Sequence, residues 1–224
     1  MTGRIDAVLF DFDHTLGIAH LVEEHVLQRL SGKYGLPVPS VEAMSAALNR
    51  FRAGQETLDE MLDGVFGSVM PGAAIEAEYK RDTLRALPSA LVPMPGVAEM
   101  LEAFRDRSTP IAILTNGWTE YQMAKAAMIG FPGPVYASEE IGLWKPDKRA
   151  FCYAVDGLGA VPATTLFVGD TPQSDVAGAK AAGLQAAWAD FEGKRYPDDV
   201  VRPDFVIHAL TELPAIVDAV GKAS

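Results

Sequence analysis

Short apolar runs that end in polar residues recur along this chain, and they restrict its fold more than any other feature. They cover residues 7–10 (Ala-Val-Leu-Phe), 111–114, 165–168, 186–189 and 205–207. Because these runs lack polar alternation, each predicts a strand that is buried on both faces, as in a parallel sheet.

Helical patterns lie between these runs. Apolar side chains at 97, 100, 101 and 104 have the spacing of one helix face, and helices are also predicted over 122–128, 150–158 and 176–182. Alternating strands and helices predict an α/β fold with a Rossmann-like parallel sheet.

The stretch from Ile18 to Leu91 breaks this alternation and contains no convincing strand. It carries several helical stripes, and residues 57–60 (Thr-Leu-Asp-Glu) form a capping-box sequence before one of them. We therefore expect an all-helical cap subdomain over 17–91, inserted into a core formed by 1–16 and 92–224.

Charge narrows the range of partners. The 224 residues include 19 Lys and Arg against 30 Asp and Glu, a formal net charge of −11. This balance argues against a sequence-independent nucleic-acid binder and against attachment to anionic lipid through basic patches. A phosphorylated substrate remains compatible with it, since a local cation or metal can outweigh the overall field.

The remaining global features favour a cytoplasmic protein. Cys152 is the single cysteine, so no intrachain disulfide can form. The first residues do not form a signal peptide, and no apolar run reaches the length of a membrane span. Either a monomer or a homodimer fits these features.

The segment Asp11-Phe12-Asp13 follows the first predicted strand. Residues two apart on a strand point the same way, so both carboxylates should face one place beyond the strand end, where open parallel sheets bind ligands. A divalent cation would relieve their repulsion. The alternative for this segment alone is a solvated turn with two surface acids.

Three more segments lie at expected strand ends or in loops: Leu114-Thr115-Asn116-Gly117, Lys145-Pro146 and residues 168–175 (Val-Gly-Asp-Thr-Pro-Gln-Ser-Asp). A Thr hydroxyl and the next amide can hold an anionic oxygen, and Lys145 can supply positive charge. Asp170 can complete a hard oxygen site for magnesium, with Asp175 in the following turn. The alternative for each segment alone is an ordinary helix cap or a surface charge.

In this order the segments resemble the four motifs of the haloacid dehalogenase-like hydrolase superfamily. The matching residues are Asp11-x-Asp13-x-Thr15, Thr115, Lys145-Pro146, and Gly169-Asp170 with Asp175. The helical insert resembles the cap of the phosphoglycolate phosphatase-like subgroup, which inserts its cap after the first motif.

The resemblance implies a role for each matching residue. Asp11 would be the nucleophile that forms an aspartyl-phosphate, and Asp13 the acid that protonates the leaving oxygen and then activates water. The groups implied in phosphoryl binding are Thr115, the backbone amide of Asn116, and Lys145. The implied magnesium ligands are Asp11, the backbone carbonyl of Asp13, and Asp170, with Asp175 assisting.

Substrate choice should come from the cap, where His20 is a substrate-binding candidate because it lies near the first motif. Dehalogenating members lack an acid at the position of Asp13, because halide needs no proton to leave. The resemblance thus implies a magnesium-dependent phosphatase acting on a small phosphorylated metabolite. A phosphomutase of the same superfamily and a non-enzymatic phospho-accepting or binding module are the alternatives.

Overall fold

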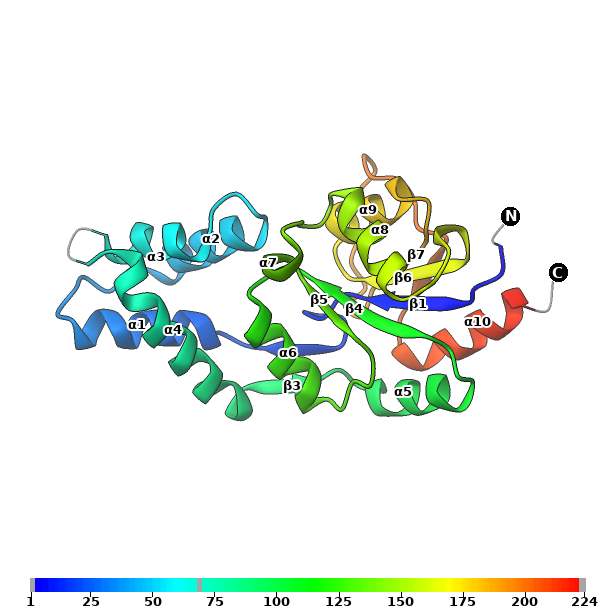
Figure 1. The fold of residues 1–224 in the computed structure, drawn as a ribbon, viewed down its shortest axis with the longest axis horizontal. Coiled ribbons are helices and arrows are strands. Elements are labelled where there is room, and N and C mark those ends of the chain that lie inside the picture. Colours follow the sequence, from blue (N-terminus) through cyan, green and yellow to red (C-terminus); the bar gives the residue numbers. More distant parts are fainter. Residues whose placement is uncertain (1–2, 68–69, 222–224) are drawn as a thin grey trace.

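A six-stranded sheet forms the centre of the computed structural model, which describes residues 3–67 and 70–221 (Figure 1). The strand order is β5-β4-β1-β6-β7-β8, and all neighbouring pairs are parallel. The strands are β1 Ala7–Phe10, β4 Ile111–Thr115, β5 Val135–Ala137, β6 Thr165–Gly169, β7 Gln185–Ala189 and β8 Phe205–Ile207. The predicted Rossmann-like α/β fold is confirmed, with β5 as a strand that the sequence analysis missed.

Helices cover both faces of this sheet. Val8 and Phe10 of β1 pack into the cluster beneath α5 and α10, whereas Leu9 packs into the cluster beneath α8 and α9. This alternation explains why the run is apolar throughout. The core helices are α5 Val97–Asp106, α6 Thr119–Met128, α7 Ser138–Ile141, α8 Lys148–Gly157, α9 Ala177–Ala181 and α10 Leu213–Gly221, with 3-10 turns at Pro162–Thr164 and Leu210–Glu212.

Four helices form the cap beside the sheet (Figure 1). They are α1 Val22–Lys33, α2 Val41–Arg52, α3 Leu58–Phe66 and α4 Gly72–Ala86, followed by a 3-10 turn at Leu87–Ser89. The predicted capping box at the start of α3 is confirmed by reciprocal hydrogen bonds between Thr57 and Glu60. Trp118 and Tyr121, from the start of α6, complete the apolar cluster of the cap.

A two-stranded ribbon connects the cap helices to the core. β2 (Gly17–Ala19) pairs antiparallel with β3 (Leu91–Pro93). The expectation that residues 18–91 lack strands is therefore wrong at both ends of that stretch. Each strand has three residues and gains its hydrogen bonds from a partner about 70 positions away, so local periodicity does not reveal it. The division into a core of 1–16 and 92–224 and a cap of 17–91 stays a prediction.

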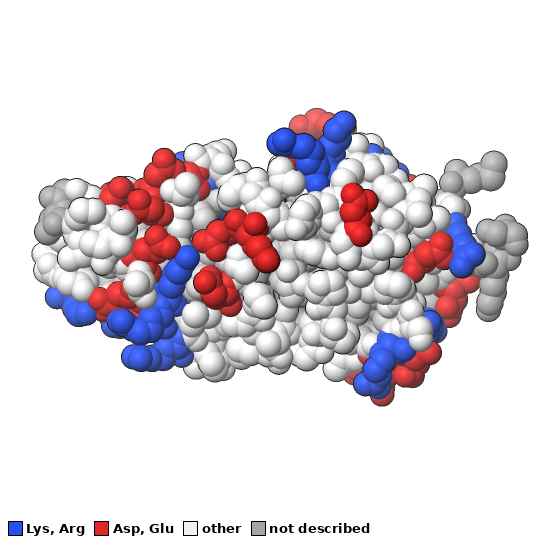
Figure 2. All heavy atoms as spheres, in the orientation of Figure 1, with Lys and Arg blue, Asp and Glu red and all other residues white. Residues whose placement is uncertain are grey.

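Positive and negative side chains are mixed on the face of the molecule drawn in Figure 2. On the face drawn in Figure 2, Lys and Arg side chains occur in separate groups, most of them beside Asp or Glu, and the described residues present no broad basic surface there. Within residues 3–67 and 70–221, no helix combines the length and apolar character needed to cross a membrane.

Candidate active site

A cavity of about 460 Å³ lies at the carboxyl ends of β1, β4 and β6, next to the end of α2. Parallel sheets bind ligands at this edge because the strand ends and helix starts converge there. Every predicted site residue except His20 lines this cavity, namely Asp11, Asp13, Thr115, Asn116, Lys145, Asp170 and Asp175. The four sequence motifs therefore meet in one place.

Lys145 is buried between two carboxylates. Its Nζ donates hydrogen bonds to Asp11 Oδ1 at 2.6 Å and to Asp175 Oδ1 at 2.7 Å. Burial raises the pKa of Asp11 to about 7, although Lys145 acts in the opposite direction. Burial also disfavours the ammonium group, but Asp11 and Asp175 outweigh that effect and raise the pKa of Lys145. Lys145 is thus a fixed positive charge beside Asp11.

Tight backbone packing holds Asp170 and Asp175 near each other. A Cβ on Gly169 would lie 2.4 Å from Asp175 Oδ2, so only glycine permits this approach. Asp175 Oδ2 also accepts a hydrogen bond from the backbone amide of Thr171, at 3.0 Å, within the turn that leads into the π-helical turn Pro172–Val176. The indole N–H of Trp188 donates to the backbone carbonyl of Asp170 at 2.9 Å.

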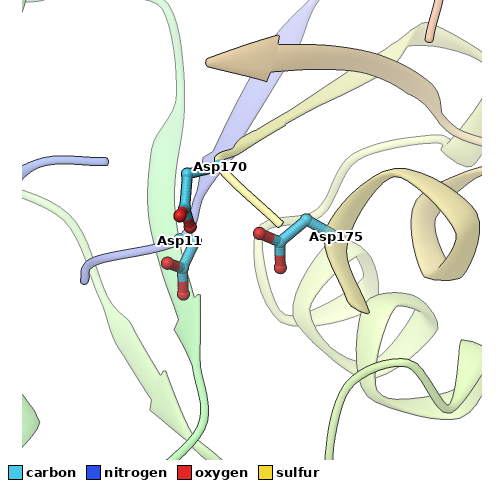
Figure 3. A group of neighbouring side chains, drawn as sticks. All are labelled: Asp11, Asp170 and Asp175. Carbon is cyan, nitrogen blue, oxygen red and sulfur yellow. The ribbon is translucent and has the colours of Figure 1, made fainter. Parts of the chain in front are cut away.

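The carboxylates of Asp11, Asp170 and Asp175 point toward one another, and each offers an oxygen within 4.8 Å of the others (Figure 3). Burial, and next the charge of Asp175, raise the pKa of Asp170. Lys145 supplies one positive charge to three negative groups, so the cluster retains negative charge. Carboxylate oxygens are hard donors of the kind that magnesium prefers. These residues therefore fit a divalent cation.

Asp13 lines the same cavity as Asp11 and has a lysine of its own. Lys125 Nζ, from α6, donates to Asp13 Oδ1 at 2.8 Å and to Oδ2 at 2.7 Å. Burial opposes ionisation of Asp13, but Lys125, with Arg52, outweighs it and lowers the pKa of this carboxyl. The sequence analysis missed Lys125. The available signal was a lone lysine four residues after Tyr121, on the buried face of α6.

Thr115 and Asn116 follow directly from the buried strand β4. Thr115 lines the cavity beside Asp11. The side chain of Asn116 accepts a hydrogen bond from the backbone N–H of Lys145 at 2.9 Å and donates to the carbonyl of Lys145 at 3.1 Å. It also donates to the carbonyl of Arg52 at 2.8 Å. Asn116 thus links the loop of Lys145 to the end of cap helix α2.

The cap contributes a cation to the cavity. Arg52 lines it, together with Ala53 and Gln55 from the loop after α2. The Arg52 guanidinium pairs with the buried carboxylate of Glu23, which also accepts a hydrogen bond from the hydroxyl of Tyr79 at 2.9 Å. The charge of Glu23 raises the pKa of Arg52. Arg52 is therefore a permanent positive charge at the mouth of the site.

His20 lies outside the main cavity. It is exposed and lines a smaller cavity of about 190 Å³, which shares Asp13, His14 and Arg52 with the main one. The structure thus places His20 beside Asp13 and Arg52 in this neighbouring cavity, and not in the cavity that Asp11 lines. Its role in substrate binding stays a prediction.

Comparison with known proteins agrees with this geometry. The profile of the haloacid dehalogenase-like hydrolase family matches residues 5–183. The chain therefore belongs to this family of hydrolases.

Two kinds of activity occur among its relatives. A phosphoserine phosphatase of Thermus thermophilus is 31% identical over 199 residues, which cover 87% of this chain and 76% of that protein. A 2-haloacid dehalogenase of Pseudomonas syringae has the same fold, with a TM-score of 0.77 at 23% identity, over 96% of this chain and 99% of the other. The HAD-hydrolase YfnB of Bacillus subtilis, solved with bound magnesium, aligns with a TM-score of 0.71 at 23% identity over the same shares.

Proposed function

We propose that this hydrolase is a magnesium-dependent phosphatase that cleaves a small phosphomonoester through an aspartyl-phosphate on Asp11. The observation that carries the proposal is a second carboxyl, Asp13, beside Asp11 in the same cavity. Displacement of halide needs no proton donor at this place, whereas an ester oxygen leaves readily only when it is protonated. This arrangement supports ester cleavage over dehalogenation.

In the first step, a carboxylate oxygen of Asp11 attacks phosphorus and the ester P–O bond breaks. Asp13 gives its proton to the departing oxygen, which leaves as an alcohol. The bound phosphoryl group brings negative charge next to Asp13, and this charge favours the protonated carboxyl before the step. Lys145 and Thr115 stabilise the phosphoryl oxygens as their charge redistributes.

In the second step, Asp13 takes a proton from water, and the water oxygen attacks the phosphorus of the aspartyl-phosphate. The bond between phosphorus and the Asp11 oxygen breaks, which releases inorganic phosphate and restores the carboxylate. Magnesium held by Asp11, Asp170 and Asp175 would neutralise negative charge on the phosphoryl group. The carbonyl of Asp13 is a further ligand in this proposal.

The lining of the cavity supports a small, hydrophilic substrate. Besides the four motifs it offers Arg52, Gln55 and Gln173, and none of its described lining residues is a Phe, Tyr or Trp. A volume of about 460 Å³ is large enough for a small phosphorylated metabolite. We therefore propose a phosphorylated metabolite as the partner of this site.

Phosphate release from a panel of sugar phosphates, phosphorylated acids and nucleoside monophosphates tests the proposal. It is measured with magnesium and with chelator, for the natural chain, for Asp11→Asn, and for Asp156→Asn at an exposed position of α8 as a control. We expect magnesium-dependent release that Asp11→Asn abolishes and Asp156→Asn preserves. Halide release from 2-haloacids without phosphate release would instead identify a dehalogenase, and phosphate transfer that needs a phosphorylated activator would identify a mutase.

A further inference from the structure

Lys125 is a buried cation that lies behind the cavity rather than in its wall. Only 1% of its side chain is exposed, and it is not among the described residues that line the site. Transfer of an unpaired ammonium group into a protein interior is strongly unfavourable, so its position requires a compensating partner. Within residues 3–67 and 70–221, that partner is the carboxylate of Asp13, whose two oxygens accept hydrogen bonds from Lys125 Nζ.

Aromatic rings fix the ammonium group from two sides. Lys125 Nζ lies 4.8 Å from the ring centre of Phe12 and 4.7 Å from that of Tyr121. The Tyr121 ring stacks on Trp118 at 5.2 Å, and Trp118 is buried in the cap cluster. Such cation–π contacts stabilise a cation most where water is excluded. The ammonium therefore has little freedom to follow Asp13 if that carboxylate moves.

The two acids of the first motif consequently have separate lysines. Asp11 pairs with Lys145, whereas Asp13 pairs with Lys125. The Asp13 side chain is 40% exposed, so its carboxylate is held from behind and open toward the cavity. A single ammonium that contacts both oxygens restricts rotation of the carboxylate about its Cβ–Cγ bond.

We propose that Lys125 is a positioning residue that holds the Asp13 carboxyl in the orientation required for proton transfer to the leaving oxygen. The proposal rests on the proposed phosphatase function. Lys125 acts through Asp13 and does not contact the substrate. Its contribution should therefore depend on how strongly the leaving group needs a proton.

This dependence separates a positioning role from a merely structural one. An alkyl phosphate releases a basic alkoxide unless its oxygen is protonated, whereas p-nitrophenyl phosphate releases a stable phenolate. The ratio kcat/KM reports the first chemical step for both esters. Because misplacement of a catalytic group by about 1 Å costs on the order of 100-fold, we expect Lys125→Met to lower kcat/KM about 10- to 100-fold for the preferred alkyl ester. For p-nitrophenyl phosphate the loss should be no more than about threefold, since the proton contributes little there.

Lys180 supplies a matched control. It forms the same kind of pair, donating to both oxygens of Asp204 at 2.9 and 2.7 Å, away from the cavity. We expect Lys180→Met to leave the ratio of the two kcat/KM values unchanged. In an Asp13→Asn background, Lys125→Met should have almost no further effect on the alkyl ester, because both changes remove the same function.

Equal losses for both esters, or a full additional loss in the Asp13→Asn background, would overturn the positioning role. If Lys125→Met does not fold, Lys125→Arg keeps the charge while shifting its donors, and it should show the same selective loss for the alkyl ester. Absence of that selectivity would also overturn the role. A natural chain that cleaves neither ester would instead refute the phosphatase proposal itself, and the positioning role with it.

Discussion

The contact between Gly54 and Trp144 gives a direct test of how the cap loop is seated on the core. Gly54 has φ +68°, and a Cβ built there would lie 2.6 Å from Trp144 Cγ and 2.9 Å from Cδ2. Trp144 immediately precedes Lys145, and the neighbours of Gly54, Ala53 and Gln55, line the cavity. An added methyl group must therefore displace the cap loop or the indole ring.

The expected cost has two parts. A non-glycine residue in the left-handed region costs about 1 kcal/mol, and overpacking against a ring that cannot move freely adds about 1–3 kcal/mol. Gly54→Ala should thus lower the free energy of unfolding by about 2–4 kcal/mol. Displacement of this loop, which carries Gln55 and directly follows Arg52, should also raise KM.

A substitution at Gly35 separates the cost of the left-handed backbone from the cost of the contact with Trp144. Its φ is +67°, and within the described part of the chain no atom lies within 4 Å of an added Cβ. Gly35→Ala should cost about 1 kcal/mol and leave KM unchanged. Urea unfolding and steady-state kinetics of both variants measure the difference. If Gly54→Ala matched Gly35→Ala in stability and in KM, the seating of the cap loop on Trp144 would be refuted.

Three further predictions concern the cavity. Lys145→Met leaves buried carboxylates without their ammonium, so urea unfolding in chelator should show a loss of about 3–5 kcal/mol, and phosphate release should cease. Asn116→Ala removes the hydrogen bonds that link the Lys145 loop to the Arg52 carbonyl. The free energy of unfolding should fall by about 1–3 kcal/mol, and steady-state kinetics should show a higher KM. The pKa of Asp11 is raised from 3.8 to about 7, so the metal-free native state binds the extra proton. As the pH rises from about 4 to about 7, the free energy of unfolding of the metal-free protein should therefore fall. Magnesium affinity, measured by titration, should rise over the same range because Asp11 loses its proton. Asp11→Asn should flatten both profiles, and an unchanged slope would contradict this assignment.

The sheet could be predicted from the sequence because its central strands are buried on both faces. Every residue of β1, β4 and β6 is buried, and the stretches 7–10, 111–114 and 166–168 within them are apolar throughout. By contrast, β5 has three residues at the sheet edge, two of them half-buried. A strand of that length carries no distinctive period and depends on pairing with β4.

The acidic residues of the site could be predicted because they follow strand ends. The side chains that pair with them could not all be predicted from the sequence. Asp11, Asp13 and Asp170 are placed by the ends of β1 and β6. The pairing of Asp13 with Lys125 joins residues 112 positions apart and depends on how α6 packs against the cap. His20 was predicted to bind substrate because it lies near the first motif in the sequence. In the structure it lines the neighbouring cavity and not the main one, so proximity in sequence alone did not place it correctly.

In the proposed mechanism Asp11 carries the phosphoryl group during turnover, and this intermediate can be detected directly. The natural chain is mixed with its preferred ester and magnesium, quenched in acid within the first turnovers, and analysed by mass spectrometry of the intact protein and its peptides. We expect a mass gain of one phosphoryl group on the peptide that contains Asp11, and no gain for Asp11→Asn. Release of phosphate without this mass gain, or a mass gain on another residue, would show that Asp11 is not the nucleophile.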